Sequence, residues 1–126
     1  MRIGVFGGTF DPVHMGHLAV AEEVRERLVL EEVLFVPAGQ PWLKSGQDVS
    51  SGHHRLEMVK LAVASNSHFR ALDIEIRRPG PSYSADTLEE LEKDWNWQAE
   101  LHFLVGADAI MEMARWQRPG RIFELA

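Results

Sequence analysis

The stretch Gly7-Gly8-Thr9-Phe10-Asp11-Pro12-Val13-His14-Met15-Gly16-His17 decides the fold, because it joins a strand-like run to a helix-like run through a glycine-rich loop. The strand-like run covers residues 2–6, and the helix-like run begins at Leu18. In α/β proteins such a turn binds phosphates, since free backbone N–H groups and the positive end of the helix converge there. His14 and His17 are three residues apart at the expected helix start, so both can face one phosphate chain.

Other interpretations of this stretch fit it less well. Neither the dinucleotide fingerprint G-x-G-x-x-G nor the Walker pattern G-x-x-x-x-G-K-[ST] matches it. The glycines could merely build a tight turn, with His14 and His17 as a helix start that binds no ligand. Two histidines at this spacing could also share a zinc ion, but no third ligand is nearby and the chain has no cysteine. We therefore predict no metal site in the protein itself.

Composition bounds the class of protein. The chain has 126 residues, of which 45% are hydrophobic and 25% charged, which predicts one globular domain with a modest core. A formal net charge of -6 argues against binding to nucleic acid or to an anionic membrane surface, but not against a small anionic ligand. No apolar run is long enough to cross a membrane, and no secretory pattern begins the chain. We therefore expect a cytoplasmic protein.

Strand-like and helix-like segments alternate along the chain. The expected strands are residues 2–6, 33–36, 69–76 and 101–105, and residues 38–52 form a long polar loop. Apolar stripes at helical spacing mark three helices, namely Leu18, Ala21, Val24 and Leu28; Leu56, Val59 and Val63; and Leu88, Leu91 and Trp95, the last with Ser84 as its cap. This alternation predicts an α/β fold with a mostly parallel, doubly wound sheet.

The last part of the chain also reads as helical. A helical stretch is expected from Asp108, and residues 121–126 read as a helix turn with apolar residues facing a core. Neither a glycine cap nor a polar tail follows this turn. We therefore expect residues 1–126 to form one domain that lacks a C-terminal segment.

Further motifs stand at separated places along the chain. They are Pro41-Trp42-Leu43-Lys44, Arg55-Leu56-Glu57-Met58, Arg78-Pro79-Gly80-Pro81-Ser82-Tyr83-Ser84-Ala85-Asp86-Thr87, Gly106-Ala107-Asp108 and Trp116. The stretch from Gly8 to His17 adds a nucleotidyltransferase signature in its H-x-G-H form. On these residues the chain resembles the bacterial nicotinate mononucleotide adenylyltransferase family over essentially its whole length.

The resemblance has two departures. Trp42 and Leu43 differ from the Pro-Pro-His-Lys that is commonest in the family's loop, while Lys44 is kept. The family's C-terminal Ile-Ser-(Ser/Thr)-x-x-Ile/Val-Arg motif, which holds the ATP phosphates, does not occur in this chain. The resemblance therefore implies the Rossmann-like fold of the nucleotidyltransferase superfamily and its substrate class more firmly than full activity of residues 1–126 alone.

The family's activity is adenylyl transfer from ATP, as the Mg²⁺ complex, to nicotinate mononucleotide, which gives nicotinate adenine dinucleotide and pyrophosphate in NAD biosynthesis. The resemblance assigns catalysis to His14, His17 and Lys44. It assigns nucleotide binding to Gly8, Thr9, Phe10, Gly106 and Asp108, and binding of the pyridine nucleotide to Tyr83, Thr87 and Trp116. We expect no nucleic-acid or membrane partner, and a homo-oligomer is possible.

The chemistry of adenylyl transfer suits these residue types. The attacking phosphate oxygen is already an anion at neutral pH, so no general base is needed, and positioning and electrostatics are the expected catalytic terms. His14 and His17 are donors that can become cationic beside phosphate, and Lys44 can supply a point charge from its loop. Plain alternatives remain for Asp108 as a helix N-cap and for Trp116 as a core residue.

Two other functions stay open on sequence grounds. One is a related transferase that acts on pantetheine phosphate or uses CTP. The doubled glycine, His14, the motif that ends at Thr87, and Trp116 weigh against it. The other is a nucleotide-binding module without turnover. The sequence also leaves open whether nicotinate or nicotinamide mononucleotide is preferred.

Overall fold

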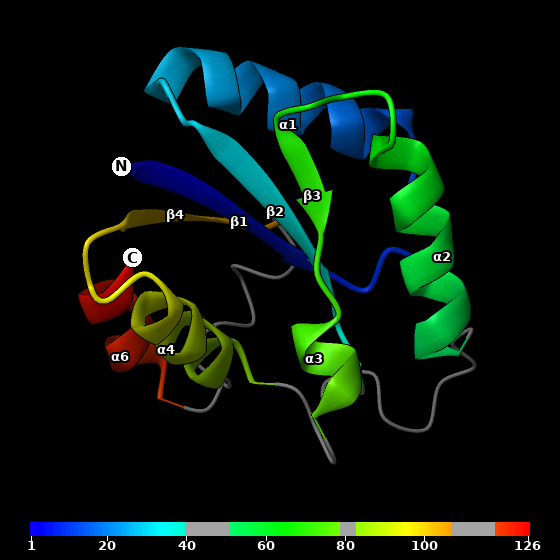
Figure 1. Cartoon of the computed structure of the whole chain (residues 1–126). Coiled ribbons are helices and arrows are strands. Elements are labelled where there is room, and N and C mark those ends of the chain that lie inside the picture. Colours follow the sequence, from blue (N-terminus) through cyan, green and yellow to red (C-terminus); the bar gives the residue numbers. More distant parts are fainter. Residues whose placement is uncertain (40–50, 79–82, 107–117) are drawn as a thin grey trace.

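The computed structural model describes residues 1–39, 51–78, 83–106 and 118–126, in which strands and helices alternate (Figure 1). The elements in chain order are β1 (Arg2–Gly8), α1 (Met15–Leu28), β2 (Glu32–Pro37), α2 (Gly52–Val63), β3 (Phe69–Ala71), α3 (Ile74–Arg77), α4 (Ser84–Asp94), β4 (Glu100–Leu104) and α6 (Pro119–Leu125). The expected helical stretch from Asp108 and most of the expected loop 38–52 lie outside the described residues.

The described strands form one parallel sheet in the order β3-β2-β1-β4. Gly8 of β1 is opposite Pro37 of β2, and Phe6 of β1 is opposite Leu104 of β4, so the carboxyl ends of neighbouring strands meet at one edge. The chain moves outward from β1 to β2 and β3, and then returns to the other side of β1 with β4. This reversal places a topological switch point between β1 and β4, where open α/β sheets bind their ligands.

Helices cover both faces of the sheet, as a doubly wound fold requires. Along β2, Val33 and Phe35 pack with residues of α1 and α2, while Leu34 and Val36 pack with residues of α3, α4 and α6. Figure 1 shows α1 and α2 on one side of the sheet and α4 and α6 on the other. All four side chains are at most 1% exposed, and each such burial is worth about 1.5–3 kcal/mol. The predicted α/β class and the parallel doubly wound sheet are confirmed.

The segment expected as one strand over residues 69–76 was predicted wrongly in its second half. β3 ends at Ala71, and Ile74–Arg77 forms the short helix α3. The N–H of Leu72 still bonds to the carbonyl of Phe35 (2.9 Å), but the next donor on β2 would be Pro37, which has no N–H. The ladder stops there, and the chain turns into α3 with Ile74 buried at 5% exposure.

Smaller differences concern helix ends. Ser84 was expected to cap the third helix, but it is the first residue of α4, which follows Tyr83 without a side-chain cap. Leu28 was expected on the buried stripe of α1 and is 37% exposed, because the helix ends there and Val29 turns to a left-handed backbone. The expected helical turn at the chain end is confirmed as α6, whose Ile122 is buried. In the described parts of the chain, the helices are too short or too polar to cross a bilayer.

Candidate functional site

A buried phenylalanine anchors the loop that joins β1 to α1. Phe10 has a backbone φ of 51°, a left-handed conformation that bulky residues rarely adopt. The residue is 3% exposed, and its ring packs between Phe6 and Phe35, with ring centroids 5.4 and 5.8 Å away. Burial of the ring offsets the unfavourable backbone, so the loop is held against the carboxyl edge of the sheet.

His14 and His17 cap the start of α1 reciprocally. Nδ1 of His14 accepts a hydrogen bond from the N–H of Gly16 (3.1 Å), and Nδ1 of His17 accepts one from the N–H of His14 (3.0 Å). The two rings stack with centroids 3.8 Å apart. A Cβ at Gly16 would lie 2.9 Å from Cε1 of His14, so glycine at this position lets the His14 ring fold back over the helix start.

This capping fixes the tautomer of both rings. Because each Nδ1 accepts a hydrogen bond, the proton of a neutral ring must be on Nε2. Nε2–H of His14 and of His17 is then the donor that each ring can offer to a ligand. The partial positive charge of the helix start acts in the same place, so the whole arrangement favours an anion.

Burial and the neighbouring ring influence the charge of His17. Burial lowers the pKa of His17 below its ordinary value, and a positive charge on His14 lowers it further. Its ring contacts Phe10 and Phe6 edge-on, with centroids 5.1 and 5.9 Å away. In the free protein His17 is therefore a neutral donor at pH 7. A bound phosphate would oppose both effects, because its negative charge favours the cation.

Arg55 of α2 is the buried cation beside this loop. It is 1% exposed, and its guanidinium donates to the carbonyl of Thr9 (2.9 Å) and of Gly39 (3.1 Å) and to that of Ala38. Burial lowers its pKa, which the negative charge of Asp11 partly opposes, yet arginine stays protonated in proteins. Arg55 was not among the predicted site residues, although it begins the motif Arg55-Leu56-Glu57-Met58. Its spacing of four and eight residues from Val59 and Val63, both buried, was the available signal.

A second polar cluster is built around Thr87 of α4, on the other face of the sheet. Its hydroxyl donates to Oε2 of buried Glu75 (2.6 Å) and accepts from Nη1 of Arg78 (3.1 Å). Arg78 also bonds to Glu90 (3.2 Å). Thr87 is 2% exposed, so the hydroxyl proton of this predicted substrate-binding residue is engaged inside the protein. This cluster joins α3 to α4.

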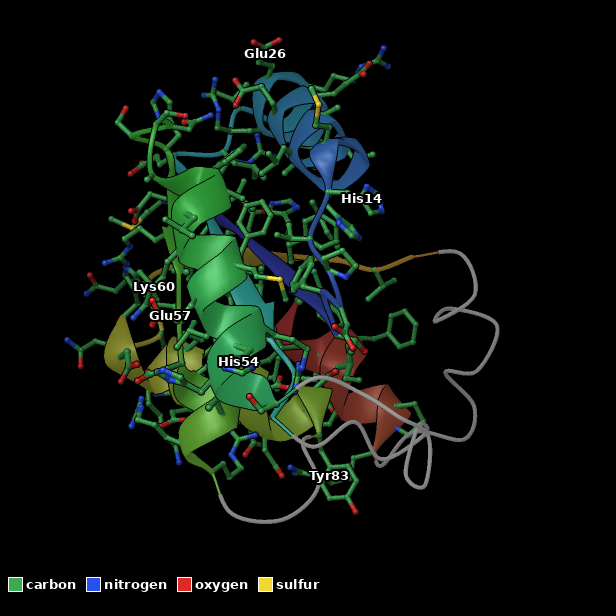
Figure 2. All side chains as sticks on the ribbon, turned by 90° about the vertical axis from the view of Figure 1, so that its right-hand side faces the viewer. His14, Glu26, His54, Glu57, Lys60 and Tyr83 are labelled. Atoms are coloured by element: carbon green, nitrogen blue, oxygen red, sulfur yellow. The ribbon has the colours of Figure 1, made fainter. Side chains whose placement is uncertain are left out.

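The predicted site residues fall into groups. Gly8, Thr9, Phe10, His14 and His17 are brought together in the loop and the start of α1. Gly106 follows β4 on the other side of the switch point and is exposed. Figure 2 shows His14 and Tyr83 well apart, Tyr83 being next to α4. Lys44, Asp108 and Trp116 lie outside the described residues. Over the described ranges, no three His, Asp or Glu side chains gather as a metal site.

The matches to a family profile and to individual known sequences agree with one another. The profile of the family described as cytidylyltransferase-like matches residues 5–126. A protein of Dehalococcoides mccartyi named "probable nicotinate-nucleotide adenylyltransferase" is 46% identical over 99% of this chain and 61% of its own length. A protein of the same name from Thermomicrobium roseum is 49% identical over 99% of this chain and 58% of its own length. The chain thus spans about three fifths of the length of these relatives.

Solved structures agree on the fold. The Plasmodium falciparum nicotinic acid mononucleotide adenylyltransferase complexed with NaAD aligns with a TM-score of 0.80 and 19% identity, over 96% of this chain and 59% of that one. The same protein complexed with APC aligns with a TM-score of 0.76, over 96% of this chain and 58% of that one. At this identity the likeness shows a shared fold.

Proposed function

We propose that this chain, which belongs to the cytidylyltransferase-like family, transfers the adenylyl group of ATP to nicotinate mononucleotide. The products are NaAD and pyrophosphate. The observation that carries the proposal is the pair of stacked, reciprocally capping histidines at the start of α1, next to the switch point of the sheet. The printed names of the relatives and the NaAD complex of the solved structure support the choice of acceptor.

The reaction needs charge neutralisation rather than a base. A phosphate oxygen of the mononucleotide attacks the α-phosphorus of ATP, the bond from that phosphorus to the bridging oxygen breaks, and pyrophosphate leaves with the electron pair. Mg²⁺ enters with ATP as part of the substrate and neutralises part of its charge. Two anions must still be brought together, and donors aimed at the α-phosphate lower that barrier.

In this proposal His14 and His17 supply these donors through Nε2–H. Their Nδ1 atoms are occupied by backbone N–H groups, so the rings are held in place before substrate arrives. Such preorganisation avoids a reorganisation cost during the reaction. The pKa of His17 is lowered in the free protein, and a phosphate that raises it again would bind together with a proton.

The remaining roles are proposed from the resemblance. Lys44 supplies a point charge to the phosphates, and Asp108 with Gly106 holds the adenosine ribose at the end of β4. Tyr83 and Trp116 hold the pyridine nucleotide together with the segment of Thr87. Because the hydroxyl of Thr87 is engaged with Glu75 and Arg78, we assign the contact with the substrate to backbone N–H groups of that segment.

The test is pyrophosphate release from ATP and Mg²⁺ with nicotinate mononucleotide, nicotinamide mononucleotide or phosphopantetheine as acceptor. The 126-residue chain is assayed beside a form extended at its C-terminus with the matching segment of the Dehalococcoides relative. Release that depends on nicotinate mononucleotide supports both the reaction and the acceptor. Release with phosphopantetheine instead would favour a different transferase. ATP binding without release in either form would leave only a nucleotide-binding module.

A further inference from the structure

We propose that Arg55 is a positioning residue of the nucleotide site, which turns the peptide of Thr9 and Phe10 so that its N–H faces the bound phosphates. The inference rests on the proposed function only for the identity of the ligand. Arg55 is 1% exposed, so it acts through the backbone rather than by touching substrate.

The contacts of Arg55 gather carbonyls from two loops at one point. Nη1 donates to Thr9 in the β1–α1 loop, 46 residues away in sequence, and also to Ala38 after β2. Nη2 donates to Gly39. A planar guanidinium presents several N–H groups in fixed directions, so it can hold these carbonyls together in one arrangement. The ends of β1 and β2 are thereby tied to α2.

When the carbonyl of a peptide group points into the protein, the N–H of the same peptide group points the other way. The Thr9–Phe10 peptide is trans, since the cis bond of this loop is Asp11–Pro12. In a trans peptide the C=O and the N–H point in opposite directions. The carbonyl of Thr9 points to Arg55, so the N–H of Phe10 points away from it. Within the described ranges no hydrogen bond uses that N–H, so we assign it to the bound anion.

Packing around Gly39 makes this arrangement rigid. A Cβ at Gly39 would lie 2.2 Å from the carbonyl oxygen of Glu75, so the backbone of Gly39 is pressed against α3 while its carbonyl bonds to Arg55. The ring of Phe10 is buried on the side of α1 and α2. The loop is thus fixed by the ring of Phe10 and by the carbonyl of Thr9, and Arg55 supplies the second of these restraints.

The experiment compares the unsubstituted chain with Arg55→Lys and with Val59→Ala. Lysine keeps the charge but not the fork of donors. Val59 is fully buried on the same helix and belongs to the apolar cluster there. Val59→Ala is therefore the matched control, because it lowers stability through the same helix. The probe is ATP with Mg²⁺, its dissociation constant measured by calorimetry, while ¹H–¹⁵N spectra follow the amides of Phe10 and Gly39 with and without ATP.

We expect Arg55→Lys to weaken ATP binding about tenfold or more and to move the Phe10 amide resonance before ATP is added. Val59→Ala should lower the melting temperature and leave ATP affinity within about twofold. The proposal is overturned if Arg55→Lys changes neither the Phe10 amide nor the affinity. It is also overturned if Val59→Ala weakens ATP binding as much, since the effect is then one of stability alone.

The unsubstituted chain gives a readout that needs no variant, should Arg55→Lys not fold. The Phe10 amide must then shift when ATP is added, and the guanidinium protons of Arg55 must exchange slowly with water; a stationary Phe10 amide overturns the proposal. The amide shifts without ATP judge the role of Arg55 even in a chain that releases no pyrophosphate. Failure of the positioning role and failure of the proposed reaction are therefore distinguishable.

Discussion

The starts of α1 and α4 differ in how their polar groups are arranged. At α1, the imidazoles of His14 and His17 bond to N–H groups two and three residues away. At α4, no side chain caps the helix, and Thr87 instead bonds to Glu75, twelve residues back along the chain. The arrangement at α1 leaves Nε2–H groups for a ligand, whereas the donors of the Thr87 cluster at α4 bond to other groups of the protein. The local motif at α1 therefore keeps donors for the phosphate site that we propose, while the long-range cluster at α4 joins parts of the fold.

The comparison is tested most strongly by removing His17. In a form that releases pyrophosphate, we expect His17→Ala to lower turnover by about 10²–10³ with little change in the KM for ATP, because the lost donor acts in the transition state. Steady-state kinetics of pyrophosphate release measure this. His54→Ala is the control, since His54 is exposed at the start of α2 (Figure 2). An effect of His17→Ala on KM alone would count against its catalytic role.

The next largest effect is expected at Gly39, which lies between the two regions. Its carbonyl bonds to Arg55, which also holds Thr9 before α1, and its backbone packs against Glu75, the partner of Thr87. Gly39→Ala puts a Cβ 2.2 Å from the carbonyl oxygen of Glu75, and backbone must move, so we expect destabilisation of about 3 kcal/mol. Gly120→Ala is the control, because a Cβ there meets nothing within 4 Å and alanine favours the helix. Urea unfolding of both variants measures the two changes in unfolding free energy. Equal stability of the two would show that Gly39 does not pack as described.

A moderate effect is expected at Thr87. Thr87→Val keeps the shape but removes the hydroxyl that donates to Glu75 and accepts from Arg78, so we expect a loss of about 1–3 kcal/mol in unfolding free energy. Ser84→Ala is the control, since no side-chain cap is lost at that end of α4. If Thr87→Val left stability intact but weakened binding of nicotinate mononucleotide, the hydroxyl would belong to the substrate site instead.

The smallest effect is the dependence of stability on pH through His17. Its pKa in the folded chain is lowered by burial and by His14, so between that value and the ordinary value of about 6.5 the unfolded chain binds more protons. Stability must therefore fall as pH falls through this window. His17→Gln keeps a side chain suited to the capping box but does not titrate. Unfolding in urea at pH 7.5 and 5.5 should show a larger loss for the unsubstituted chain; a larger loss for the variant contradicts the assignment.

Contiguous patterns predicted the parts of the molecule that local chemistry determines. The run Val33-Leu34-Phe35-Val36 is a buried parallel strand, as its unbroken apolar character indicated. The stretch that contains His14 and His17 joins a strand to a helix as expected, and the histidines face one another. Their use as reciprocal caps was not predicted, because the two side chains were considered as ligands for phosphate or zinc, or as a helix start without a ligand, and none of these specified a bond from a ring to the backbone.

Tertiary pairing determined what the pattern could not. Residues 72, 74 and 76 alternate as in a strand, yet Pro37 on the neighbouring strand offers no N–H and the ladder stops. The role of Arg55 depends on three carbonyls that are distant in sequence. The predicted contributions of Lys44, Asp108 and Trp116 fall outside the described residues and stay predictions.

Nitrogen-edited NMR of the six histidines tests the central claim most directly. In the free chain, Nδ1 of His14 and of His17 should have the shift of an unprotonated acceptor, with the proton on Nε2. On addition of ATP and Mg²⁺, Nε2 of these two rings should shift, while exposed His53 and His54 stay unchanged. A proton on Nδ1 in the free chain, or a response to ATP at His53 and His54 instead, would contradict the account.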